Sequence, residues 1–210
     1  ALLCDGCDWT ALAAAVAYAA ALRIARFHTS NEFGDWDTAL HTFTFANAIH
    51  QGLRRAPSVE LVRGVFDAAI SIYLDRFLNM PAAKMPEANG AVTASGAALG
   101  ELATLLDRQQ QVNASAQKVA HYLYGGGEAA PLLAQVGKLL LREDRDFHTI
   151  QAVEAAFRQY ELLRHTGDGV PVLVAAIRYL SAHAPTVRAQ GQTYQIAHRL
   201  HQGDRLFEGE

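Results

Sequence analysis

The sequence predicts an all-α protein, a bundle of about eight to nine mostly antiparallel helices that form a single domain over residues 1–210. Apolar residues recur at helical spacing along almost the whole chain. No stretch alternates Val, Ile or Tyr with polar residues, as a half-exposed strand would. Half of the 210 residues are apolar, which is enough for one sizeable core.

The first helix is expected from Trp9 to Ser30, with Asp8 as its N-terminal cap. Helical spacing puts small residues and one histidine on a single stripe, namely Ala14, Tyr18, Ala21, Ala25 and His28. Small side chains let a neighbouring helix approach closely, so this stripe is predicted to face the core.

Capping residues and glycine or proline breaks delimit the remaining helices. These are expected from Asp35 or Asp37 to Arg55, and over 59–79 after Ser58, 98–110, 114–124 after Asn113, 129–142, 147–164 after Asp146, 170–182 and 186–202. Residues 80–97 hold two prolines, two glycines and little periodic apolar content. This composition predicts a flexible loop between two helical parts of the domain.

Charge and hydropathy exclude two classes of partner. The formal net charge is -3, and Lys and Arg are scattered singly or in pairs, so we expect no nucleic-acid partner. The longest apolar run, residues 9–22, is shorter than the ~20 residues of a membrane span and is mostly alanine. Basic residues follow this run instead of preceding it, unlike in a signal peptide. We therefore expect a cytoplasmic protein without a membrane partner.

Two similar stretches, FHTSNEFGDWDTALHTF and DFHTIQ, carry the candidate chemistry. If the first helix continues by one turn, His28 and Glu32 project from the same face. His41 lies near the start of the second helix, so a short connection would bring it back to them. His148 occupies the same position in a later helix, within LREDRDFHTIQ. We expect these three imidazoles to meet at one pocket.

Imidazole and carboxylate side chains are the ligands that iron or another divalent metal uses in helical bundles. We therefore predict that His28, His41, His148 and Glu32 bind such a metal or act as acid–base groups on a small-molecule substrate. The amides of Asn31 and Gln151 would orient them. The Glu-x-x-His spacing typical of di-iron bundles does not occur.

Other interpretations use the same residues. A histidine beside Asp and Thr at a helix start can simply complete the junction, and Asn47 and His50, which share a face, are expected to contact the third helix. The chain would then be a non-catalytic scaffold that binds a partner or forms a homodimer through alanine-rich faces. A helical sensor would instead show an apolar pocket without converging imidazoles.

The stretches FHTSNEFGDWDTALHTFTFANAIHQ, YLDRFLNMPAAKMP and LLREDRDFHTIQAVEAAFRQY resemble a bacterial helical domain associated with Rieske iron–sulfur proteins, which is distantly similar to the questin-oxidase-like group. The resemblance implies an oxidoreductase that receives electrons from a Rieske-type redox partner. The chain departs from that arrangement because neither Cys4 nor Cys7 is part of a Cys-x-His ligand pair. The resemblance therefore implies an external iron–sulfur electron donor.

Overall fold

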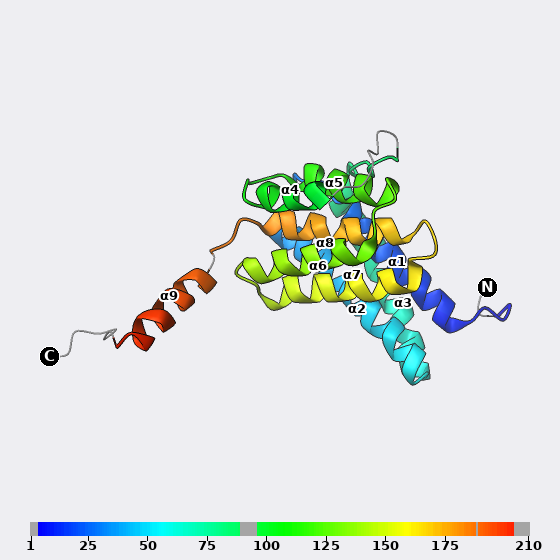
Figure 1. The fold of residues 1–210 in the computed structure, drawn as a ribbon. Helices are drawn as coiled ribbons and strands as arrows, with labels where there is room; N and C mark the ends of the chain where they lie inside the picture. The colour runs from blue at the N-terminus through cyan, green and yellow to red at the C-terminus, as the bar shows by residue number, and fades with distance from the viewer. Residues whose placement is uncertain (1–3, 89–95, 188, 204–210) are drawn as a thin grey trace.

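The computed structural model describes residues 4–88, 96–187 and 189–203, and the described part is all-α, as predicted. It contains nine α-helices, one short 3-10 helix and no strand (Figure 1). In chain order the elements are α1 (Trp9–Ala25), α2 (Phe33–Arg55), α3 (Val59–Leu74), η1 (Asp75–Asn79), α4 (Gly96–Leu106), α5 (Val112–Tyr124), α6 (Ala129–Arg142), α7 (Phe147–Leu163), α8 (Gly169–His183) and α9 (Ala189–His201). No described helix combines the length and apolar character that a bilayer span requires.

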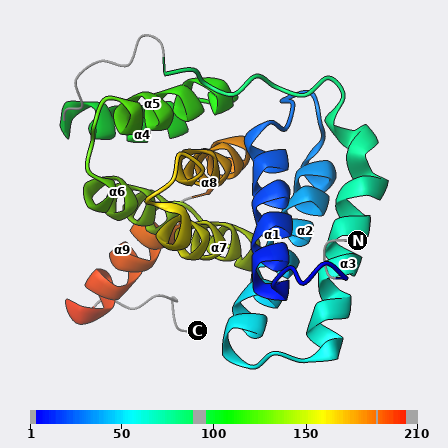
Figure 2. The ribbon, with the colours of Figure 1, turned by 90° about the vertical axis from the view of Figure 1, so that its right-hand side faces the viewer.

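Helix α8 is the centre of the bundle. It packs against α1, α5 and α7, and Figure 2 shows these helices arranged around it. Helices α4 and α5 lie on one side, while α1, α2 and α3 form the other side, with α3 at its edge. Residues 172–181 of α8 are all buried, because neighbours surround the helix. An apolar sequence on every face is what such a position requires.

Helix α1 faces the core with small residues, but the predicted stripe is only partly correct: Ala21 and Ala25 are buried, whereas Ala14 and Tyr18 are half-buried and His28 lies outside the helix. Its buried positions are Ala13, Ala17, Ala20, Ala21, Ile24 and Ala25, together with the half-aliphatic side chain of Arg23. Methyl side chains on this face allow α2 and α8 to approach the helix axis closely. Asp8 caps the helix as expected, since its carboxylate accepts a hydrogen bond from the Ala11 amide at 3.1 Å.

The prediction that the first helix reaches Ser30 is wrong, because α1 ends at Ala25. Phe27 is fully buried against Trp36, with ring centroids 5.0 Å apart, so the chain turns inward there. Free carbonyls at the end of a helix need donors. Here the Ala83 amide donates to the Arg26 carbonyl at 2.8 Å, and the Arg178 guanidinium donates to the Phe27 carbonyl.

Several other boundaries also differ from expectation. The third helix ends at Leu74 and continues as the 3-10 helix η1. Helix α5 begins at Val112, and Asn113 is not its cap, because the Asn113 side chain accepts a hydrogen bond from Arg178. Ser58 and Asp146 cap their helices as predicted. Of the loop expected over 80–97, residues 80–88 are non-helical as predicted, residues 89–95 lie outside the described residues, and residues 96 and 97 belong to α4 instead.

Candidate functional site

The two halves of the chain meet at His41 and His148. Their Nε2 atoms are 3.0 Å apart and their rings are stacked, with centroids 5.1 Å apart. The other ring nitrogen of His148, Nδ1, lies 3.3 Å from an Asp146 carboxylate oxygen. Since a carboxylate only accepts, this contact places a hydrogen on Nδ1 and makes Nε2 of neutral His148 the acceptor of a hydrogen bond from His41.

Asp146 has two tasks in this arrangement. Its carboxylate caps α7 by accepting from the Thr149 amide at 2.9 Å, and it also orients the His148 ring. Burial alone would raise the pKa of Asp146, but the hydrogen bonds from Thr149 and His148 outweigh burial and lower the pKa. The carboxylate is thus held in its charged form beside the imidazole pair.

His28 lies apart from this pair. Because α1 ends before it, His28 belongs to the α1–α2 connection, where its Nδ1 accepts a hydrogen bond from the Ser30 amide at 3.2 Å and contacts the Ser30 hydroxyl at 2.7 Å. Glu32, and not Asp35 or Asp37 as predicted, is the N-cap of α2, and its amide donates to the Asp35 carboxylate at 3.1 Å. Nine residues, or more than two helical turns, then separate Glu32 from His41.

The four-residue ligand set is therefore not assembled. Across the described ranges, no group of three or more His, Cys, Asp or Glu side chains is placed to hold a metal ion. Of the two amides expected to orient the site, Gln151 is exposed on α7, whereas the buried Asn31 Nδ2 has no hydrogen-bond partner in the described part of the chain. The residues present do not fit the predicted metal site, and no reaction step through a metal follows from them.

A second polar cluster lies where α2 meets α8. The Tyr179 hydroxyl donates to the Asp37 carboxylate at 2.7 Å, and His183 Nε2 lies 3.6 Å from the same oxygen. His183 Nδ1 is 2.8 Å from the Tyr179 carbonyl and so must carry a hydrogen. Burial, and then the hydrogen bond to Asp37, raises the pKa of Tyr179, so the phenol stays protonated.

The two ring nitrogens of His183 have different surroundings in this second cluster. In neutral His183 the hydrogen lies on Nδ1, so Nε2 carries a lone pair. This buried Nε2 atom faces Asp37 and has no hydrogen-bond partner among the described residues. A proton gained there would form an ion pair with Asp37. His183 is not among the site residues predicted from the sequence, although the i, i+4 spacing of Tyr179 and His183 indicates that both face one neighbour.

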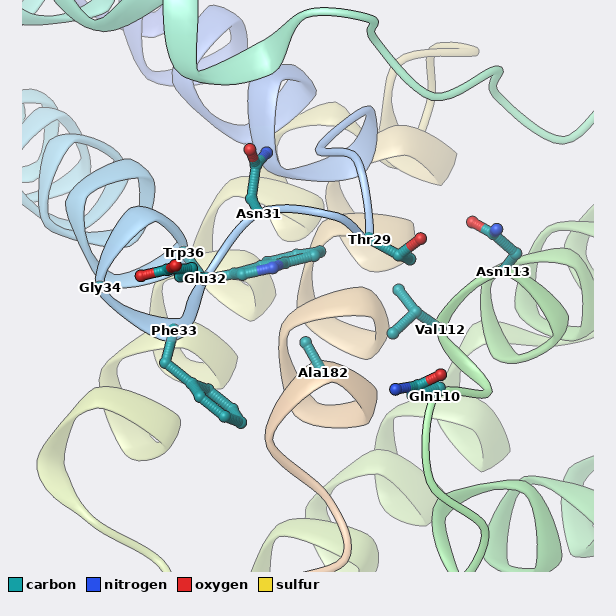
Figure 3. Close-up of a pocket in the computed structure, with 10 residues that line it drawn as sticks. All are labelled: Thr29, Asn31, Glu32, Phe33, Gly34, Trp36, Gln110, Val112, Asn113 and Ala182. Carbon is teal, nitrogen blue, oxygen red and sulfur yellow. The ribbon is translucent and has the colours of Figure 1, made fainter.

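A pocket of about 630 Å³ adjoins the second cluster. Phe33 connects them, because it lines the pocket and its ring lies 5.2 Å from the His183 ring. Ten residues line the pocket: Thr29, Asn31, Glu32, Phe33, Gly34, Trp36, Gln110, Val112, Asn113 and Ala182. Figure 3 shows the Gln110 amide extending from the α4–α5 turn toward the space beside Ala182, whereas the Glu32 carboxylate points away from it.

A buried amide network joins α2 to α7. Gln159 donates through Nε2 to the Asn47 side-chain oxygen at 2.8 Å and lies 3.1 Å from His50 Nδ1. The expectation that Asn47 and His50 contact the third helix is therefore wrong, since their partner is on α7. Burial lowers the pKa of His50, so the neutral ring is favoured. This network fixes the two helices that carry His41 and His148.

Comparisons with protein-family models, curated proteins and solved structures found no match to this chain. The resemblance to the Rieske-associated helical domain therefore stays a prediction.

Proposed function

We propose that this helical domain binds a small organic molecule in the pocket between the α1–α2 connection, the α4–α5 turn and the end of α8. A volume of about 630 Å³ falls in the range of small-molecule sites. The lining combines aromatic rings with amide and hydroxyl groups, which is the usual composition of such sites. The proposal rests mainly on the backbone conformation of Gln110.

Gln110 has φ of 62° and is the one non-glycine residue with positive φ among the described residues. A side chain of this size is unfavourable in the left-handed region, and such conformations cluster at functional sites. Glycine at this position would relieve the strain but would also remove the amide from the pocket. The strained backbone thus presents a hydrogen-bonding group to a ligand.

The lining indicates a flat, polar ligand. The Phe33 ring is 64% exposed, so an aromatic ligand can stack on it while Gln110 bonds a carbonyl or hydroxyl group. The His183 ring contacts the Phe33 ring and supports it at the edge of the pocket, but His183 itself does not line the pocket. Oxidoreductase activity and a Rieske-type electron donor stay predictions, since neither the geometry nor the comparisons bear on electron transfer. The predicted divalent metal has no assembled ligand set among the described residues.

Ligand-observed NMR with a panel of aromatic amides and phenols tests the proposal. Ala182 lies in the pocket wall, so Ala182→Leu fills part of the space and should abolish the binding signals. Ala134→Leu, at an exposed site on α6, is the matched control and should leave them unchanged. Binding that survives Ala182→Leu in a folded protein, or no binding by wild type, would contradict the proposed pocket.

A second candidate function, self-association, rests on the outer face of α3 and η1. This face carries large apolar side chains that are 49% to 66% exposed, namely Val59, Phe66, Ile70, Tyr73, Leu74 and Phe77. Continuous exposed apolar surface is typical of an interface. Arg63 and Asp67 are exposed on the same helix and carry opposite charges, so a two-fold axis between two copies would pair them.

Sedimentation analysis over a range of protein concentrations tests this second function. We expect a dimer that Ile70→Glu dissociates, because the substitution places a carboxylate in the apolar contact. Leu141→Glu is the control, since Leu141 is 54% exposed on α6, outside the proposed interface. A wild-type protein that stays monomeric at every concentration would refute self-association.

A further inference from the structure

Arg178 is a buried cation that has no acidic partner among the described residues. It lies in the centre of α8 and is 1% exposed, and no carboxylate in the described ranges forms an ion pair with it. Its guanidinium donates to the Asn113 side-chain oxygen at 2.7 Å and to the Phe27 carbonyl, while Nε has no partner among the described residues. Burial lowers the pKa of Arg178 to about 10, and the group stays charged at neutral pH.

A cavity of about 420 Å³ lies beside this guanidinium, where residues 81–86, which follow η1, form part of its wall. Arg178, Asn113, Gln117, His28 and Lys84 are its polar lining residues, and none of its lining residues is acidic. The bond from the Ala83 amide to the Arg26 carbonyl at 2.8 Å fixes the segment over the end of α1. Arg178 and Lys84 place positive charge on the wall of this cavity.

The polar groups around the cavity include several free donors. His28 Nδ1 accepts from the Ser30 amide, so neutral His28 carries its hydrogen on Nε2. The Lys84 ammonium has no hydrogen-bond or ion-pair partner in the described part of the chain. Asn113 uses its oxygen for Arg178, which leaves its NH₂ group to donate. These hydrogen-bond donors lack acceptors in the protein, and an anion would supply acceptor oxygens to them.

We propose that this cavity binds a small oxyanion, a carboxylate or a phosphate group, against Arg178, with Lys84 and His28 as further donors. A guanidinium offers five N–H groups in a planar fork that matches two oxygens of such a group, and here only two bonds to protein acceptors are formed. An anion would also neutralise a charge that is otherwise costly to bury. The cavity is distinct from the imidazole pair and from the pocket of the proposed function.

The two cavities share one residue. Asn113 lines both, and the adjacent residues His28 and Thr29 line one each. An organic acid or phosphorylated compound could thus place its anionic group against Arg178 and its body beside Gln110. This extension rests on the proposed function, whereas the oxyanion site itself does not.

Titrations with sodium phosphate, sodium acetate and sodium chloride at matched ionic strength, followed by amide NMR shifts, test the oxyanion site. We expect saturable shifts around the cavity with phosphate or acetate and none with chloride, and the preferred anion identifies the ligand class. Lys84→Gln should weaken that binding about 2- to 5-fold, as expected for one exposed charge. The matched control Lys138→Gln, at an exposed site on α6, should not change it.

Arg178→Met should abolish the binding in a protein that is folded by circular dichroism. If this variant does not fold, Lys84→Gln and His28→Ala decide the outcome, since both residues lie in or beside loops. The inference is overturned by the absence of saturable shifts, by equal effects of Lys84→Gln and Lys138→Gln, or by a folded Arg178→Met that binds like wild type. Phosphate binding that survives Ala182→Leu would separate this site from the proposed pocket.

Discussion

Replacing Gln159 by leucine should destabilise the protein strongly, because the amide lies at the centre of the buried network between α2 and α7. Gln159 is 1% exposed, and its NH₂ group serves Asn47 at 2.8 Å and His50 at 3.1 Å. Leucine fills a similar volume but donates no hydrogen. The substitution would therefore leave two buried acceptors without partners, in a region from which water is excluded.

The size of the loss follows from these two acceptors. Each unsatisfied buried group costs about 1–3 kcal/mol, and leucine recovers part of the sum through apolar contacts, so we expect a loss of about 3 kcal/mol in the free energy of unfolding. For a chain of this length each kcal/mol lowers the Tm by about 2–4 °C. The expected decrease in Tm is therefore about 6–12 °C.

Urea denaturation and thermal unfolding of matched variants provide the assay. Gln151→Leu makes the same chemical change at an exposed site on the same helix and should alter the free energy of unfolding by less than about 0.5 kcal/mol. Adding Asn47→Leu to Gln159→Leu should restore part of the loss, since it removes one orphaned acceptor. Equal stabilities of Gln159→Leu and Gln151→Leu would refute the reasoning.

Three further predictions concern stability. Burial lowers the pKa of His50 in the folded protein, so the unfolded chain takes up a proton at His50 more readily. The stability due to neutral His50 is therefore lost as the pH falls below about 6.5. The decrease in Tm from pH 7 to 5 should be smaller in His50→Gln than in wild type, and equal pH profiles would contradict this. Gly127→Ala should destabilise the protein, because a Cβ there would lie 2.6 Å from the Tyr122 carbonyl oxygen. Gly137→Ala on α6 is the control: its Cβ meets nothing within 4 Å, and it should stabilise the protein by up to about 1 kcal/mol. The reverse order of stability in urea denaturation would contradict the close packing of Gly127 on Tyr122. Asp8→Ala should cost about 1 kcal/mol by loss of the α1 cap, and an unchanged unfolding midpoint would show that the cap is not needed.

Much of the fold could be predicted from local patterns. Helical periodicity determines the element type, and caps such as Asp8 and Ser58 mark helix starts that depend only on neighbouring residues. The end of α1 could not be predicted in this way. The chain turns there because the buried Phe27 is drawn into the core and because Ala83 and Arg178, far away in sequence, satisfy the released carbonyls.

In the candidate site, too, local patterns predict some features, whereas others depend on residues far away in the sequence. His41 and His148 meet as predicted, because α2 packs against α7, although His41 lies in the third turn of α2 and not at its start. His28 does not join them, because its placement depended on the wrong helix end. Arg178 was missed, although a single charged residue within the apolar run VPVLVAAIRYLSA is a readable signal of a buried cation. Which groups surround it depends on loop packing that no local pattern specifies.

The central claim, that the pocket beside Gln110 holds a small organic molecule, is tested most directly by a crystal structure of the protein soaked with aromatic amide and phenol fragments. We predict fragment density on the exposed face of Phe33, with a hydrogen bond to the Gln110 amide and with the positive φ of Gln110 retained. Density for fragments only at other surfaces, with Gln110 in an ordinary backbone conformation, would contradict the proposed function.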